Sequence, residues 1–115
     1  WLKSDDTLLT QKTLIKLGVR IDDQGDAMKI HGLKGDFQAV TEPIYLGNSG
    51  TSMRLLTPMV SLGKGIYTLV GSERMHQRPI QDLLDSMNQM GIPAWKLAVP
   101  STGSAIHWKP LWPWL

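Results

Sequence analysis

A loop of glycine and small polar residues constrains the fold most, because residues 46–51 read Leu-Gly-Asn-Ser-Gly-Thr and lead straight into an apolar run. In that run Met53, Leu56, Met59 and Val60 recur at helical spacing, with further apolar residues on the other side. This pattern predicts a largely buried helix. Pro58 cannot donate to the carbonyl of Arg54, so a kink is expected there.

The rest of the chain predicts further helices and strands, and so an α/β fold. Residues 4–7 offer N-cap oxygens for a first helix that ends at Gly18. Other expected elements are a strand at 27–31 after a turn at 22–26, a strand at 66–70, a polar loop at 71–77, and a helix from Pro79 to Gly91. The similar helix-glycine-strand junctions at Gly18 and Gly91 hint at a repeated β/α unit.

The last part of the chain has a different composition. Four of the five tryptophans and four of the seven prolines follow Gly91. Prolines in residues 109–115 argue against a regular helix or a central strand, so we expect irregular structure there. We therefore divide the chain into residues 1–92, a partial domain, and residues 93–115, a Trp/Pro-rich tail.

Composition excludes several classes of site. The chain has no cysteine, which excludes disulfides and thiolate chemistry, and its three histidines lack metal-ligand spacing, so neither a metal nor a cofactor is expected. The twelve basic residues are scattered and form no polybasic run, which argues against nucleic acid as a partner. No apolar stretch approaches a membrane span, so a cytoplasmic protein is expected.

The glycine loop is the first candidate for chemistry. The first turn of a helix has free N–H groups and partial positive charge, and an anion can approach closely where there is no Cβ, as at Gly50. Asn48 and Thr51 add side-chain donors, and Arg54 lies within the first turns. A buried capped helix with a tight turn explains the same residues equally well.

Two further segments carry charged candidates. Arg78 precedes the helix predicted at Pro79, and a guanidinium binds oxyanions in bidentate fashion. Locally, an ordinary surface arginine paired with Glu73 is the simpler interpretation. Asp6 is either a helix-cap carboxylate, which its spacing favours, or a hydrogen-bond acceptor for a substrate hydroxyl.

Taken together, three segments are similar in order and spacing to the 5-enolpyruvylshikimate-3-phosphate synthase family. They are Ser-Asp-Asp-Thr at 4–7, the glycine loop through Arg54, and Arg-Met-His-Gln-Arg-Pro-Ile at 74–80. The resemblance implies part of one domain of a two-domain enolpyruvyl transferase fold built from repeated β/α units. It also implies transfer of the enolpyruvyl group of phosphoenolpyruvate to the 5-hydroxyl of shikimate 3-phosphate, with release of phosphate.

The resemblance also implies roles for individual residues. Gly50 and Arg78 would contact phosphoenolpyruvate, while Asn48 and Thr51 would shape the same loop. Catalytic roles are implied for Arg54, as a supporting positive charge, for Arg78, and for Asp6, as a polar residue of the cleft. Glyphosate would compete with phosphoenolpyruvate at this site.

Other interpretations stay open. The family's early lysine-serine motif would precede Trp1 and its second domain would follow residue 115, so we expect a partial site with little or no turnover. The chain would then be a non-catalytic module that binds phosphoenolpyruvate, phosphate or glyphosate, with self-association through its tail as an option. The related UDP-N-acetylglucosamine enolpyruvyl transferase usually uses a cysteine, which is absent here.

Overall fold

The computed structural model describes residues 1–99 and 103–108. The elements are α1 (Asp5–Lys16), β1 (Arg20–Asp23), β2 (Met28–His31), β3 (Ile44–Tyr45), α2 (Gly50–Val60), β4 (Tyr67–Val70), α3 (Glu73–His76), α4 (Gln81–Gln89), β5 (Ala94–Val99) and β6 (Gly103–Trp108). This order of helices and strands confirms the predicted α/β class. None of the described helices is long and apolar enough to cross a membrane.

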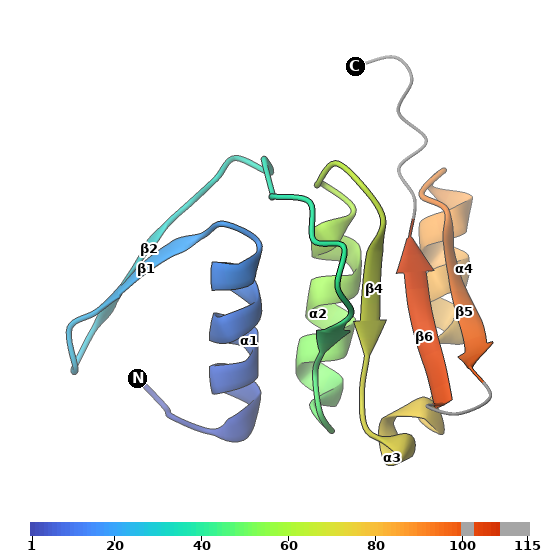
Figure 1. The fold of residues 1–115 in the computed structure, drawn as a ribbon, viewed down its shortest axis with the longest axis horizontal. Coiled ribbons are helices and arrows are strands. Elements are labelled where there is room, and N and C mark those ends of the chain that lie inside the picture. Colours follow the sequence, from blue (N-terminus) through green and yellow to red (C-terminus); the bar gives the residue numbers. More distant parts are fainter. Residues whose placement is uncertain (100–102, 109–115) are drawn as a thin grey trace.

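The strands form one sheet and one separate hairpin. The sheet has the order β3-β4-β6-β5, in which β3 runs parallel to β4 while β6 is antiparallel to both β4 and β5. Strands β1 and β2 make the small antiparallel element expected from the sequence, with Ile21 opposite Ile30. In Figure 1, α2 and α4 lie behind the sheet and α1 stands beside α2.

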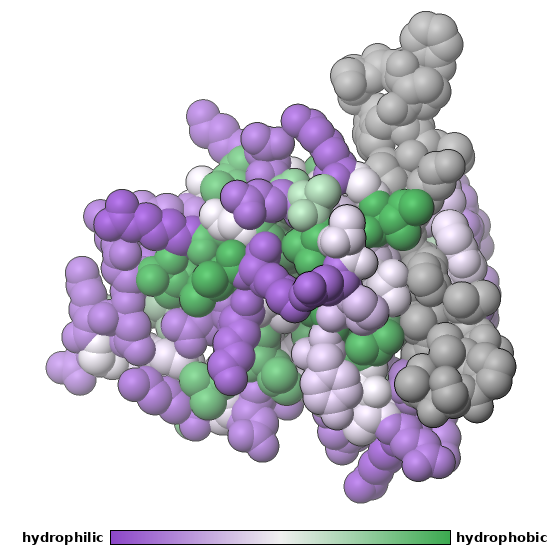
Figure 2. Space-filling view, in the orientation of Figure 1, coloured by the Kyte–Doolittle hydropathy of each residue, from purple (hydrophilic) through white to green (hydrophobic). Residues whose placement is uncertain are grey.

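Helix α2 lies at the centre of the core, as its apolar pattern predicts. The buried cluster consists of Leu17, Ile44, Leu46, Met53, Leu56, Val60, Tyr67, Leu69, Met75, Leu84, Met87 and Ala94. Leu56 and Val60 are each 1% exposed, and the helix continues through Pro58 to its end. The surface mixes hydrophilic and apolar areas (Figure 2), and Ile15 and Tyr45 are among the exposed large hydrophobic residues.

The structure differs from the sequence prediction between β4 and α4. The segment 71–77, expected to be a loop, contains the single turn of α3, whose Met75 is only 6% exposed and anchors the turn in the core. Helix α4 begins at Gln81 and has Ile80 as its N-cap, so Pro79 is not a helical residue. The carbonyl of Pro79 instead accepts a hydrogen bond from Arg54 at 2.7 Å.

The sheet continues past residue 92, because β5 and β6 both follow it and pair along their length. The division of the chain at that residue stays a prediction. The irregular structure expected for residues 109–115 lies outside the described residues.

The start of α1 supports a stability prediction. Ser4 and Thr7 form a capping box, in which Ser4 Oγ accepts from the Thr7 amide at 3.4 Å and Thr7 Oγ1 accepts from the Ser4 amide at 2.9 Å. Ser4→Ala should lower the free energy of unfolding by about 1 kcal/mol, measured by urea denaturation. Ser86→Ala, in the exposed interior of α4, is the control and should not destabilise the fold. Equal effects of the two substitutions would contradict a role for the cap.

Tyr67 supports a second stability prediction. Its ring is fully buried and its hydroxyl donates to the carbonyl of Gln38 at 3.0 Å. Tyr67→Phe should cost about 1 kcal/mol of unfolding free energy at neutral pH, because this part-buried hydrogen bond is lost. The exposed Tyr45→Phe is the matched control and should leave stability unchanged.

The same tyrosine predicts a loss of stability in alkali. Burial raises the pKa of the Tyr67 phenol above its usual value, against a smaller opposing effect of a hydrogen bond with the Lys64 backbone. The folded state therefore holds this proton more tightly than the unfolded state, so the contribution is present below pH of about 10 and is lost as pH rises toward the folded pKa. Tyr67→Phe should flatten this part of the curve of unfolding free energy against pH, and an unchanged curve would contradict the argument.

Candidate functional site

The glycine loop connects β3 to α2, and Gly50, the first residue of that helix, is buried beneath the two arginine side chains. Gly47 has a φ of 54°, which turns the chain, and its carbonyl accepts from the Ser72 amide at 2.7 Å. Ser49 is the N-cap of α2, and its Oγ accepts from the Ser52 amide at 3.1 Å. In the described part of the chain, the amides of Gly50 and Thr51 donate to no protein acceptor. Two free donors therefore remain at this helix end.

Both predicted arginines converge on Gly50. A Cβ built on this buried glycine would lie 2.5 Å from Nη1 of Arg78 and 3.1 Å from Nη1 of Arg54. The first turn of α2 holds no acidic residue, and neither arginine makes an ion pair with any described residue. In the part of the chain that the structure describes, two guanidiniums thus lie beside the positive end of a helix without an ion-paired carboxylate, an arrangement that favours a bound anion.

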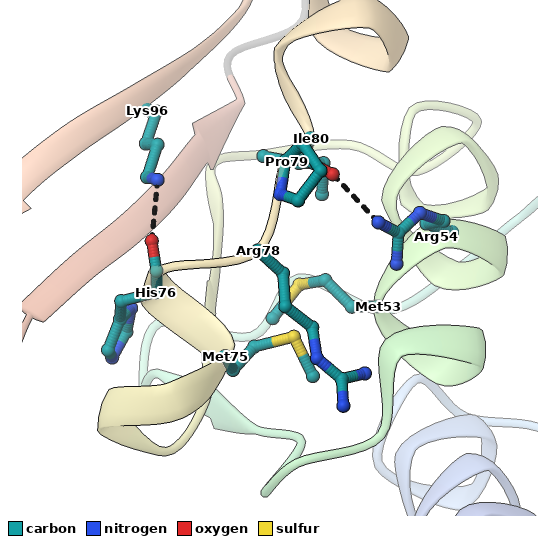
Figure 3. A pocket seen from close by; sticks show the side chains of 8 residues that line it. All are labelled: Met53, Arg54, Met75, His76, Arg78, Pro79, Ile80 and Lys96. Carbon is teal, nitrogen blue, oxygen red and sulfur yellow. Dashed lines mark hydrogen bonds between the residues drawn. The ribbon is translucent and has the colours of Figure 1, made fainter.

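Arg54 joins the start of α2 to the segment that carries Arg78. Its Nη2 donates to the Pro79 carbonyl at 2.7 Å and its Nη1 donates to the Gly50 carbonyl at 3.3 Å. Figure 3 shows this side chain reaching across to Pro79. The Arg54 guanidinium is thus hydrogen-bonded to two carbonyls and links the two segments.

Arg78 reaches the loop from the link between α3 and α4. Its amide donates to the Met75 carbonyl at 3.1 Å, and in Figure 3 its side chain extends past Met75 toward the start of α2. The sequence predicted that Arg78 immediately precedes a helix beginning at Pro79. In the structure α4 begins later, at Gln81, and the Arg78 guanidinium lies at the N-terminus of α2.

A small cavity of 20 Å³ lies between these side chains (Figure 3), room for about one water molecule. It is lined by Met53, Arg54, Met75, His76, Arg78, Pro79, Ile80 and Lys96. Lys96 donates to the His76 carbonyl at 2.7 Å and so ties β5 to the end of α3. Sequence reasoning missed Lys96, because only the pairing of β5 in the sheet brings it here and no local pattern signals that contact.

Asp6 and Asn48 line a neighbouring hollow of 460 Å³, together with Asp5, Leu8, Leu9, Lys12, Tyr45, Gly47 and Ser49. Asp6 is exposed in the first turn of α1, where the helix dipole favours its charge. The structure therefore brings Gly50, Arg54 and Arg78 together and leaves Asp6 and Asn48 on the adjacent surface. Thr51 is also exposed.

Among the described residues, no group of His, Cys, Asp and Glu could hold a metal ion.

Comparisons with known proteins agree on one family. The family model of EPSP synthase (3-phosphoshikimate 1-carboxyvinyltransferase) matches residues 1–100. The 3-phosphoshikimate 1-carboxyvinyltransferase of Paraburkholderia phytofirmans is 44% identical over 90 residues, which are 78% of this chain and 21% of that protein. The corresponding protein of a Marinomonas species is 44% identical over 93 residues, which are 79% of this chain and 22% of that protein.

The solved structures give the same result. An EPSP synthase structure from Acinetobacter baumannii matches with a TM-score of 0.80 and 28% identity, covering 95% of this chain and 25% of that one. The chain thus spans about a fifth of the length of the curated relatives it matches. The family model, the relatives and the fold all lead to one conclusion: this chain belongs to the EPSP synthase family of transferases.

Proposed function

We propose that this chain supplies the phosphoenolpyruvate-binding part of an enzyme that transfers the enolpyruvyl group of phosphoenolpyruvate to the 5-hydroxyl of shikimate 3-phosphate and releases phosphate. The observation that carries the proposal is the convergence of Arg54 and Arg78 on Gly50 at the start of α2, where no described carboxylate forms an ion pair with either arginine. Phosphoenolpyruvate carries a phosphate and a carboxylate, so it matches this charge.

The chemistry needs such an arrangement of fixed positive charge. The hydroxyl loses its proton and its oxygen adds to the carbon that bears the phosphate, while the methylene carbon gains a proton, which gives a tetrahedral intermediate. Loss of phosphate together with a proton from the resulting methyl group then restores the double bond. Anionic groups persist throughout, so preorganised donors stabilise the reacting species without a metal. In this proposal the Gly50 and Thr51 amides and the Arg78 guanidinium bind the anion, and Asn48 adds a side-chain donor.

Arg54 and Asp6 have different proposed roles. Arg54 holds the Pro79 carbonyl and the start of α2 together, and so keeps Arg78 beside Gly50. Asp6, exposed on the neighbouring hollow, accepts a hydrogen bond from a substrate hydroxyl. Glyphosate, which is anionic at both ends, would compete with phosphoenolpyruvate for the same cations.

We infer that this chain alone turns over weakly or not at all. Its cavity holds about one water molecule, so these residues form one wall of a site for a much larger ligand. Effective transfer requires both substrates held in a fixed orientation by groups on every side. Binding and turnover are therefore tested separately.

The test is calorimetric titration of the chain with phosphoenolpyruvate, followed by a phosphate-release assay with shikimate 3-phosphate added. Saturable binding that inorganic phosphate or glyphosate displaces would support the proposed site. Absence of binding at millimolar phosphoenolpyruvate would overturn it. Phosphate release that depends on both substrates would show turnover and would contradict our expectation for the chain alone.

A further inference from the structure

Three hydroxyl groups join the start of α2 to the first turn of α1. Ser49 and Ser52 are 1% and 0% exposed, and their Oγ atoms are 2.5 Å apart. Ser52 Oγ donates to the Asp6 carbonyl at 3.1 Å and lies 2.8 Å from Thr10 Oγ1, which itself reaches that carbonyl at 2.9 Å. The cluster therefore spans the contact between the two helices, which begin at the same end of the molecule (Figure 1).

The three hydroxyls form one connected hydrogen-bond network. Each hydroxyl has one proton, and Ser49 Oγ already accepts from the Ser52 amide. Ser49 then donates to Ser52 Oγ and Ser52 donates to the Asp6 carbonyl, while Thr10 Oγ1 donates to that carbonyl or to Ser52 Oγ. Buried hydroxyls are costly when unpaired, so this arrangement fixes both the side chains and the two helix ends.

We propose that Ser52 is a positioning residue that holds the anion-binding start of α2 against the helix turn that carries Asp6. The inference rests on the proposed function, because it assigns Ser52 to the geometry of that site. Ser52 follows Gly50 by two residues in α2 and donates a hydrogen bond to the Asp6 carbonyl. Apolar packing alone would let the helices slide, whereas directional hydrogen bonds set their separation.

Binding depends on how precisely the groups of a site are positioned. Groups that act on one substrate pair must stay within about 0.5 Å of their productive positions. Ser52 contacts no ligand in this scheme, because it is fully buried behind the loop. Its effect would pass through the position of the Gly50 and Thr51 amides relative to Asp6.

The variants for the test are Ser52→Ala, Thr10→Val and Thr10→Ser. Thr10→Val keeps the shape of threonine and removes the hydroxyl, whereas Thr10→Ser keeps the hydroxyl and removes a methyl group. We expect Ser52→Ala and Thr10→Val to weaken phosphoenolpyruvate binding by about 3- to 10-fold, as for loss of one hydrogen bond. Thr10→Ser should retain the original affinity.

Amide hydrogen exchange supplies an independent measurement. The Leu8 amide bonds to the Ser4 carbonyl at 2.9 Å in α1, and the Met53 amide bonds to the Ser49 carbonyl at 3.0 Å in α2. Both should exchange faster in Ser52→Ala and Thr10→Val, while the β1–β2 hairpin should not change. Faster exchange at Met53 alone would mean a local cap effect and would overturn the coupling between helices.

The two proposals fail in different ways. Unchanged affinity in both hydroxyl-deletion variants, with the wild-type chain binding phosphoenolpyruvate normally, would overturn the role of Ser52 and leave the proposed function standing. A wild-type chain that binds no phosphoenolpyruvate would overturn the proposed function, and the positioning role with it. If Ser52→Ala fails to fold, the Thr10 pair still decides the question.

Discussion

Replacing Arg78 by alanine is expected to weaken phosphoenolpyruvate binding by about 10- to 100-fold, because a hydrogen bond to a charged group contributes about 1.5 to 3 kcal/mol. Its guanidinium lies at Gly50 and, among the described residues, has no carboxylate partner, so its charge is available to a ligand. The measurement is calorimetric titration at constant ionic strength, since salt screens such charges.

The control for Arg78→Ala is Arg74→Ala, which removes the same type of side chain from an exposed position on α3. Arg74 does not line the cavity, so its loss should change affinity by less than about 2-fold, the small effect of a distant surface charge. Equal losses in the two variants would mean that only net charge attracts the ligand, and would contradict a specific Arg78 contact.

Arg78→Lys separates charge from geometry. Lysine keeps the positive charge but loses the planar pair of donors that matches a phosphate or carboxylate. We expect an affinity between those of the wild type and Arg78→Ala. Full retention of affinity by lysine would show that a point charge suffices and that bidentate geometry is not required.

Features determined by local sequence were predictable. The apolar spacing of α2 identified the helix that occupies the core, and small residues before it identified the loop at its start. Alternation and turn residues identified the β1–β2 hairpin, and the α/β class and the family were confirmed by the fold and the comparisons. Each of these elements is specified by residues close together in the sequence, so rules of periodicity and capping suffice to predict it.

Features determined by distant contacts were not predictable. The proline rule placed the last helix at Pro79, but Arg54 binds the Pro79 carbonyl and α4 begins at Gln81. The turn of α3 forms because Met75 is buried in the core, and no local pattern signals that burial. The proximity of Arg78 to Gly50 likewise depends on packing between elements far apart in sequence. Roles in catalysis for Asp6, Arg54 and Arg78 stay predictions.

The hydroxyls of Ser49 and Ser52 illustrate the same limit. In the sequence they are small residues suited to a loop and a helix start, and Ser49 does cap the helix. Their link to Asp6 requires α1 to lie against α2, which local sequence does not specify. Sequence reasoning can therefore name the residues of this site more readily than it can say which of them touch.

Gly50→Ala is expected to separate binding from stability, with affinity for phosphoenolpyruvate falling about 10-fold or more while the fold stays intact. The added Cβ would lie 2.5 Å from Arg78 Nη1, so the flexible guanidinium must move away from the helix start, at the loss of a charged hydrogen bond to the ligand. Alanine suits a helix better than glycine, so unfolding free energy should be unchanged or up to about 1 kcal/mol higher.

Gly32→Ala is the matched control, because a Cβ there would meet nothing within 4 Å and should leave affinity unchanged. A large loss of stability in Gly50→Ala would instead mean that the glycine serves packing, and would contradict the expected separation.

The double variant Gly50→Ala/Arg78→Ala tests the cause of the effect on binding. If the methyl group acts by displacing Arg78, then adding Gly50→Ala to a chain that already lacks Arg78 should lower affinity little further. Additive losses would show that the methyl group acts on a different contact, such as close approach of the anion to the free amides at the start of α2. The double-mutant cycle therefore distinguishes the guanidinium from the helix end as the group that Gly50 keeps accessible to the ligand.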